Sequence, residues 1–101
     1  GLSQAELTAG DHRWAYAHAE GRAPDAPLLV MVHGFTGSKE NWYPLVRALD
    51  GAYAVVAPDL AGWGDSQRID VADYGFAAQA ARLAAFIEAL PQRGNRPVVL
   101  V

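Results

Sequence analysis

The sequence contains no cysteine, which excludes disulfide bonds and metal sites built on thiolates. It also lacks any apolar run close to the roughly 18 residues of a membrane-spanning helix, so we expect no membrane span. Charges of one sign never form a block: eight basic and eleven acidic residues are mixed along the chain and give a net charge of −3. This balance argues against a nucleic-acid partner.

The residues that are present are typical of one small globular unit. The chain has 101 residues, of which 51% are hydrophobic and 19% are charged. Such an apolar content favours a packed core over disorder. The sequence shows no internal repeat and no low-complexity segment, so a second domain is not expected.

Four segments have the patterns of strands. Residues 12–20, HRWAYAHAE, alternate between two faces with a period of two. Three further runs are short and continuously apolar: LLVMVH at 28–33, YAVVAPDL at 53–60 and PVVLV at 97–101. Runs of this kind fit strands that are buried on both faces of a parallel sheet.

Two segments change to a helical period. Residues 38–51 carry apolar side chains at i, i+3, i+4 and i+7; Ser38 can cap their start, and Pro44 must then lie in the first turns. Residues 73–91 have one apolar face, made of Phe76, Ala80, Leu83, Ile87 and Leu90. The succession of strand–helix–strand units predicts an α/β fold with a mostly parallel sheet and helices on both faces.

The motif VMVHGFTGS ends a predicted strand in a turn. Ligands of open α/β sheets bind at the carboxyl ends of the strands. Gly34 allows a sharp turn there, and such a turn can aim the backbone N–H of Phe35 into the crevice as half of an oxyanion hole. A plain loop without chemistry is the alternative. We expect His33, which precedes the turn, to brace the loop rather than to act as a base.

The motif VVAPDLAGWGDS ends the next predicted strand. Gly62 and Gly64 flank Trp63 and indicate a tight loop over the same edge of the sheet. We expect Asp59 to accept hydrogen bonds from N–H groups of this loop; a catalytic acid is the alternative. Ser66 does not lie in the G-x-S-x-G pattern of a nucleophile elbow, and no segment of the sequence matches that pattern.

Together these motifs resemble the N-terminal half of an α/β-hydrolase-fold enzyme. The HG-x loop, the helix with its Asn-Trp pair and the PDLxGxGxS loop follow one another in the family's order, and the resemblance runs from about His12 to Val101. It is closest to the esterase and lipase branch. Epoxide hydrolases usually carry Pro in place of Thr36, and haloalkane dehalogenases usually carry Asn in place of Phe35. A C–C bond hydrolase, a cofactor-free haloperoxidase and a non-catalytic binding module of the same fold remain alternatives.

The resemblance implies a serine carboxylic-ester hydrolase that acts on a small-molecule ester and needs neither metal nor cofactor. Gly34 and Phe35 would form the oxyanion loop, and Thr36 and Trp63 would contact the substrate. Trp42, on the apolar stripe of its helix, is expected in the core instead.

The resemblance also implies that residues 1–101 are the N-terminal portion of a single α/β-hydrolase domain. In the family, the strand that resembles PVVLV leads directly into the G-x-S-x-G elbow. The catalytic triad is therefore expected beyond Val101, in a second chain or a continuation that supplies the C-terminal half. We expect residues 1–101 to be inactive alone and PVVLV to be an exposed apolar edge.

Overall fold

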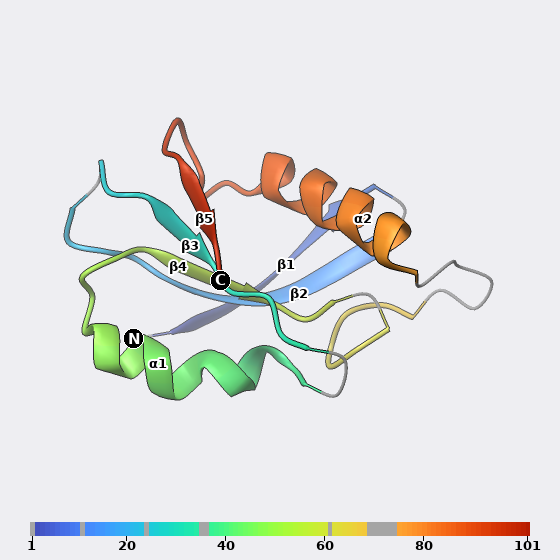
Figure 1. Cartoon of the computed structure of the whole chain (residues 1–101), viewed down its shortest axis with the longest axis horizontal. Helices are drawn as coiled ribbons and strands as arrows, with labels where there is room; N and C mark the ends of the chain where they lie inside the picture. Colours follow the sequence, from blue (N-terminus) through green and yellow to red (C-terminus); the bar gives the residue numbers. More distant parts are fainter. Residues whose placement is uncertain (1, 11, 24, 35–36, 61, 69–74) are drawn as a thin grey trace.

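The fold is described from a computed structural model of the chain. The structure describes residues 2–10, 12–23, 25–34, 37–60, 62–68 and 75–101. In chain order the elements are β1 (Ser3–Ala9), β2 (His12–Ala19), β3 (Leu28–Val30), the 3₁₀ helix η1 (Lys39–Trp42), α1 (Tyr43–Leu49), β4 (Val55–Pro58), α2 (Phe76–Ala89) and β5 (Val98–Leu100). The sheet lies between α1 and α2 (Figure 1).

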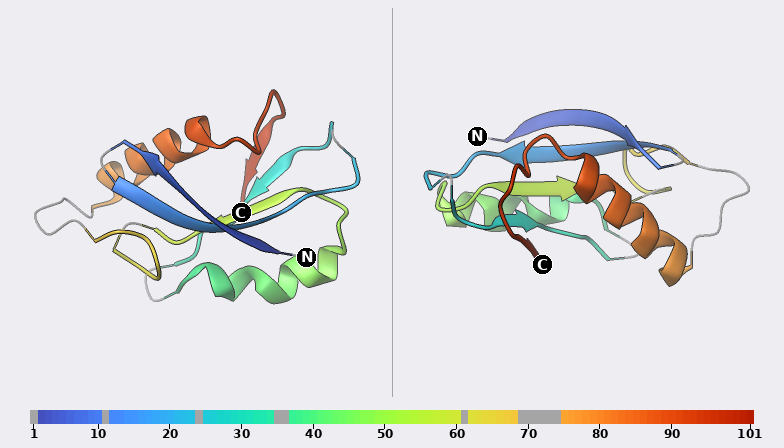
Figure 2. Two further views of the ribbon diagram at one scale, coloured as in Figure 1. Left: turned by 180° about the vertical axis from the view of Figure 1, so that it is seen from behind. Right: turned by 90° about the horizontal axis from the view of Figure 1, so that it is seen from above.

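The five described strands form a mixed sheet in the order β1-β2-β4-β3-β5. β3 pairs in parallel with β4 and with β5, whereas β1 with β2 and β2 with β4 pair antiparallel. The prediction of a mostly parallel sheet is therefore wrong for this part of the fold. The reason is the hairpin of β1 and β2, which reverses direction without the long crossover that a parallel pair requires. In Figure 2 this hairpin, in blue, curves along one edge of the sheet.

Strand β1 has no counterpart among the predicted elements. Its inward side consists of Ala5, Leu7 and Ala9, which pack on or belong to the core. Two of these three side chains are alanines, so the alternation of apolar and polar residues is weaker in β1 than in β2. The link to β2 begins at Gly10, whose φ of +62° lies in the left-handed region that glycine tolerates.

Alternate residues of β4 face two separate cores. Val56 packs on the side of α2, in a cluster that includes Trp14 and Phe86. The rings of Trp14 and Phe86 stack with their centroids 4.4 Å apart. Val55 packs on the side of α1, where Trp42 adds its partly buried ring. The predictions of helices on both faces and of a core position for Trp42 are thus confirmed.

The segment predicted as one helix over residues 38–51 divides into η1 and α1. Ser38 is the N-cap residue of η1, and its backbone N–H donates to the side-chain oxygen of Asn41 at 2.7 Å. Pro44 lies in the first turn of α1, where a missing N–H leaves no helical hydrogen bond broken. Among the described residues no helix is long and apolar enough to span a bilayer.

Helix α2 packs on the core through the second half of its predicted apolar stripe: Leu90 is buried, and Leu83 and Ile87 pack against the cluster that contains Phe86. Phe86 is fully buried, whereas Phe76 is 85% exposed. At the start of the stripe, Phe76 and Ala80 border a pocket at the sheet edge. Asp73, where the helix was predicted to begin, lies outside the described residues, and Gly75 is the N-cap of α2.

Strand β5 forms the outer edge of the described sheet, beside β3. Val99, Leu100 and Val101 are 44%, 58% and 47% exposed. The prediction of an exposed apolar edge is thus confirmed, and burial on both faces does not hold for this strand in the described chain.

Candidate functional site

The loops that follow β3 and β4 meet at one edge of the sheet. The two strands run in parallel, with Leu29 opposite Val55, so their carboxyl ends lie side by side. In the first loop, the backbone N–H of Gly37 donates to the carbonyl of Gly34 at 3.0 Å and closes the turn. Phe35 and Thr36, predicted for the oxyanion hole and for substrate contact, lie outside the described residues.

The buried side chain of His33 joins the two loops. Its Nε2 accepts a hydrogen bond from the backbone N–H of Leu60 at 3.0 Å. An amide nitrogen only donates, so the proton of a neutral imidazole must be on Nδ1, which lies 2.6 Å from the carbonyl oxygen of Gly34. Both ring nitrogens are therefore used by the loops, which confirms the predicted bracing role.

The carboxylate of Asp59, at the end of β4, is fully buried. Its Oδ1 accepts the backbone N–H of Lys39 at 2.7 Å. Its Oδ2 accepts the backbone N–H of Asp65 at 2.9 Å and the Lys39 ammonium at 2.7 Å. The prediction that Asp59 holds the loop through N–H groups is confirmed, since its acceptor sites point to loop donors.

Lys39 is the residue at this edge that the sequence analysis missed. Its side chain is only 3% exposed, and Nζ contacts carboxylate oxygens of Asp59 at 2.7 Å, Asp65 at 2.9 Å and Glu40 at 3.2 Å. Burial opposes the charged form, but the hydrogen bonds with these three carboxylates outweigh it and raise the pKa of Lys39 above its usual range. The same hydrogen bond with Lys39 lowers the pKa of Asp65.

The three carboxylates also resemble a site for a hard cation. Glu40, Asp59 and Asp65 each offer one oxygen, and these oxygens lie within 4.8 Å of one another. Oxygen ligands of this kind suit Ca²⁺ or Mg²⁺. In this structure the ammonium of Lys39 bonds to all three and supplies the positive charge that the cluster needs.

Ser66 is used by the scaffold. It is buried, and its hydroxyl donates to the backbone carbonyl of Asp59 at 2.5 Å. The same oxygen accepts the backbone N–H of Ala15 at 2.9 Å, so Ser66 ties the loop after β4 to β2. This arrangement agrees with the absence of a nucleophile pattern around Ser66.

Gly34 and Trp63 line one apolar pocket of about 300 Å³ at the carboxyl edge of β3 and β4. The other lining residues come from the two loops and from the first two turns of α2: Val32, His33, Leu60, Phe76, Gln79, Ala80 and Leu83. The structure therefore places two of the four predicted site residues together beside the turn at 34–37. Trp42 lies in the other core, on the α1 side of the sheet.

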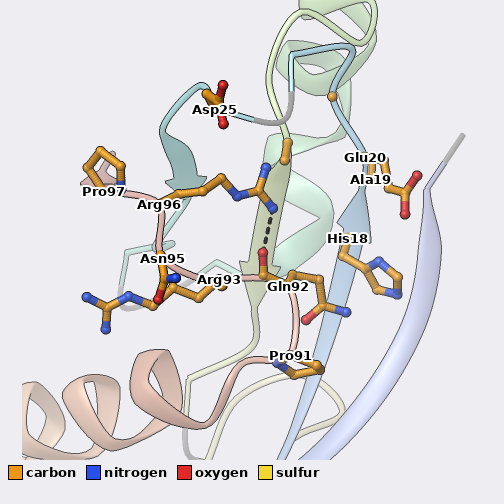
Figure 3. Close-up of a pocket in the computed structure, with 13 residues that line it drawn as sticks. His18, Ala19, Glu20, Asp25, Pro91, Gln92, Arg93, Asn95, Arg96 and Pro97 are labelled. Atoms are coloured by element: carbon orange, nitrogen blue, oxygen red, sulfur yellow. Dashed lines mark hydrogen bonds between the residues drawn. The ribbon is translucent and has the colours of Figure 1, made fainter.

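A larger pocket, of about 650 Å³, lies where β3 and β5 begin (Figure 3). It is lined by the end of β2 and by the connection between α2 and β5, in which Arg96 donates to the carbonyl of Gln92 at 2.5 Å. Positive Arg93 and Arg96 are balanced there by Glu20 and Asp25. Neither Gly34 nor Trp63, the two predicted site residues that the structure describes, lines this pocket, so the smaller pocket beside Gly34 is the candidate site.

Comparison with known proteins identifies this architecture. A family model described as "Alpha/beta hydrolase family" matches residues 29–101. "Lipase 1" of Psychrobacter immobilis is 40% identical over 83 residues, which are 82% of this chain and 25% of the lipase. A haloalkane dehalogenase of Bradyrhizobium diazoefficiens is 36% identical over 85 residues, which are 84% of this chain and 26% of the dehalogenase.

Solved structures agree with these matches. The crystal structure of a membrane phospholipase A, described as a bacterial virulence factor, superposes with a TM-score of 0.87 at 36% identity. The match covers 99% of this chain and 31% of the phospholipase. The chain spans about a quarter of the length of the two curated relatives above. With its sheet, its two loops and these matches taken together, the chain belongs to the alpha/beta hydrolase family, as an N-terminal portion of that fold.

Proposed function

We propose that the complete protein that carries this chain is a carboxylic-ester hydrolase of the lipase type, which works by serine acyl transfer. The observation that carries the proposal is the apolar pocket shared by Gly34 and Trp63. An ester with an acyl tail needs an apolar pocket directly beside the group that stabilises its carbonyl oxygen. The pocket opens next to the turn at 34–37, which is the position that this chemistry requires.

In this proposal the chain supplies charge stabilisation. Attack by a serine on the ester carbonyl places negative charge on the carbonyl oxygen. Two backbone N–H groups donate to that oxygen, one from Phe35 and one from the residue after the serine. His33 and Asp59 are used by loop hydrogen bonds, so proton transfer is assigned to other residues. The serine, the histidine and the acid come from beyond Val101, in a second chain or a continuation.

Ester hydrolysis is favoured over dehalogenation by one residue of the turn. Two of the similar proteins are called a lipase and a phospholipase, whereas a third is called a haloalkane dehalogenase. Haloalkane dehalogenases usually carry Asn at the position of Phe35. A phenylalanine side chain has no donor for a halide, whereas the backbone N–H needed for an oxyanion is present in any residue but proline.

The test is active-site labelling of the complete protein with a fluorophosphonate, followed by intact-mass analysis and assays of ester hydrolysis and halide release. We expect one probe per active site, on a serine outside residues 1–101, and hydrolysis of p-nitrophenyl esters. Halide release without ester hydrolysis would assign the protein to the dehalogenases. The absence of both labelling and turnover would identify a binding module.

A further inference from the structure

The turn at 34–37 is attached at both ends to the loop that follows β4. At its start, His33 bonds to the backbone N–H of Leu60. At its end, Lys39 reaches the same loop through its backbone N–H and its ammonium, which bond to Asp59, and through a second ammonium contact to Asp65. The turn is therefore held between two braces, one neutral and one ionic.

We propose that Lys39 is a positioning residue for the oxyanion turn: its buried ammonium fixes the turn at 34–37 against the loop that carries Trp63. The proposal rests on the ester-hydrolase function proposed above. Lys39 contacts no reacting atom in it, and acts through the carboxylates of Asp59 and Asp65.

The ammonium of Lys39 is suited to this role because all its donors are used. It has three N–H groups, and three carboxylates accept them, from Asp59, Asp65 and Glu40. A saturated, buried group of this kind holds one geometry. Buried ion pairs are weak sources of stability compared with apolar side chains of the same volume, so a geometric role accounts for this pair better than a stabilising one.

Close packing transmits the position of Lys39 to the turn. Lys39 opens η1, and a Cβ at Gly37, two residues earlier, would overlap the side-chain oxygen of Asn41 in that helix. Gly37 in turn donates to the carbonyl of Gly34. A movement of η1 therefore displaces the turn. Oxyanion donors must lie at about 2.7–3.1 Å from the developing charge, so small displacements lower the rate.

The test uses the complete protein with Lys39→Met and, as a matched control, Arg47→Met. Arg47 is an exposed cation on α1, outside the braced loops. We expect Lys39→Met to lower kcat, per site titrated with a fluorophosphonate, by at least about tenfold with KM changed less than about twofold. Hydrogen exchange of the peptide that covers residues 32–38 should become faster. Arg47→Met should change neither.

A second variant covers the case in which Lys39→Met does not fold. The double change Lys39→Met with Asp59→Asn removes both buried charges together, which proteins tolerate better than one unpaired charge. Lys39→Arg, which keeps a cation, should recover part of kcat. If the wild-type protein is an active hydrolase and the folded Lys39 variants keep its kcat and its exchange rates, the positioning role of Lys39 is overturned. The proposed function would stand in that case. A wild-type protein that neither reacts with the probe nor hydrolyses esters would overturn the proposed function, and the oxyanion role of Lys39 with it.

Discussion

The backbone of Gly64 passes so close to the side chain of Asp59 that a Cβ at position 64 would overlap the carboxylate. Gly64 also has a φ of +52°, in the left-handed region. The loop after β4 therefore closes over Asp59 only because this residue has no side chain. The carboxylate, the ammonium of Lys39 and the glycine form one packed unit.

Gly64→Ala should destabilise the protein more than the same change at Gly94. Gly94 has a similar φ of +55°, but a Cβ there meets no atom within 4 Å. Both changes carry the left-handed backbone cost of about 1–2 kcal/mol, and Gly64→Ala adds about 1–3 kcal/mol of overpacking. Urea unfolding of the complete protein measures the difference. Equal losses in the two variants would show that the loop opens without cost.

His33→Ala should lower the free energy of unfolding by about 1–3 kcal/mol, because it leaves the N–H of Leu60 and the carbonyl of Gly34 without their partner. The matched control is His18→Ala, at a half-buried position on β2 where the ring packs 5.7 Å from that of Tyr16. We expect the control to cost less than about 1 kcal/mol. Chemical denaturation of both variants measures the two losses in the free energy of unfolding. A loss for His33→Ala no larger than that for His18→Ala would contradict the bracing role of His33.

Lys39 should resist amine-reactive reagents in the folded protein. It is the one lysine among the 101 residues, its side chain is buried, and its raised pKa keeps the reactive neutral amine scarce. We expect acetylation by an N-hydroxysuccinimide ester to be at least about tenfold slower than in urea-unfolded protein. Peptide mass mapping over time measures both rates. Equal rates would contradict the buried ion pair.

The free energy of unfolding should fall at alkaline pH, where the stabilising effect of the Lys39 ion pair is lost. Folding raises the pKa of Lys39 from an ordinary value of 10.5, so the folded state holds this proton more tightly. The contribution of the ion pair to the free energy of unfolding is complete below pH 10.5. It declines as the pH rises toward the pKa of Lys39 in the folded state, because the unfolded state then binds fewer protons than the folded state. Unfolding free energies of wild type and of Lys39→Met with Asp59→Asn, compared between pH 9 and 11.5, test this. The wild type should show the steeper decline.

Trp63→Ala should change the preference for acyl length. Removal of the indole enlarges the apolar pocket beside Gly34. In the proposed ester hydrolase it would take away contacts with a longer acyl chain. We expect kcat/KM to fall by about tenfold for p-nitrophenyl octanoate and by less than about threefold for the acetate. Tyr53→Ala, at an exposed position that does not line this pocket, is the control. A uniform loss for both esters would point to damage of the fold.

The sequence patterns predicted single elements better than their pairing. Strand β2 was predicted over 12–20 and occupies 12–19, because large side chains such as Trp14 and Tyr16 mark its inward face. Strand β1 was missed, since Ala5 and Ala9 bury too little surface to make its alternation clear. The antiparallel pairing of β2 with β4 depends on contacts between residues far apart in the chain, and no local period reports them.

Within the candidate site, the glycines and the ends of the strands indicated where the loops meet, whereas the charge of Lys39 did not indicate its burial. The bracing roles of His33 and Asp59 were predictable from their positions at the ends of apolar runs. The burial of Lys39 was not, because lysine at the start of a helix is normally solvated. Its burial depends on the carboxylate of Asp59, twenty residues later, and on the space that Gly64 leaves around that carboxylate.

Because β4 lies between β2 and β3 in the sheet, the chain cannot assemble its strands in the order of their synthesis. The β1–β2 hairpin is local and can form within about 1–10 μs, whereas β4 must arrive after β3 and α1 have been made. The braces at His33 and Lys39 need β3 and β4 side by side, so we expect them to form after the hairpin. Pulse-labelled hydrogen exchange should protect residues 3–19 before residues 37–41. A nascent or stalled chain would then hold a folded hairpin long before the two loops at the carboxyl edge of the sheet are joined.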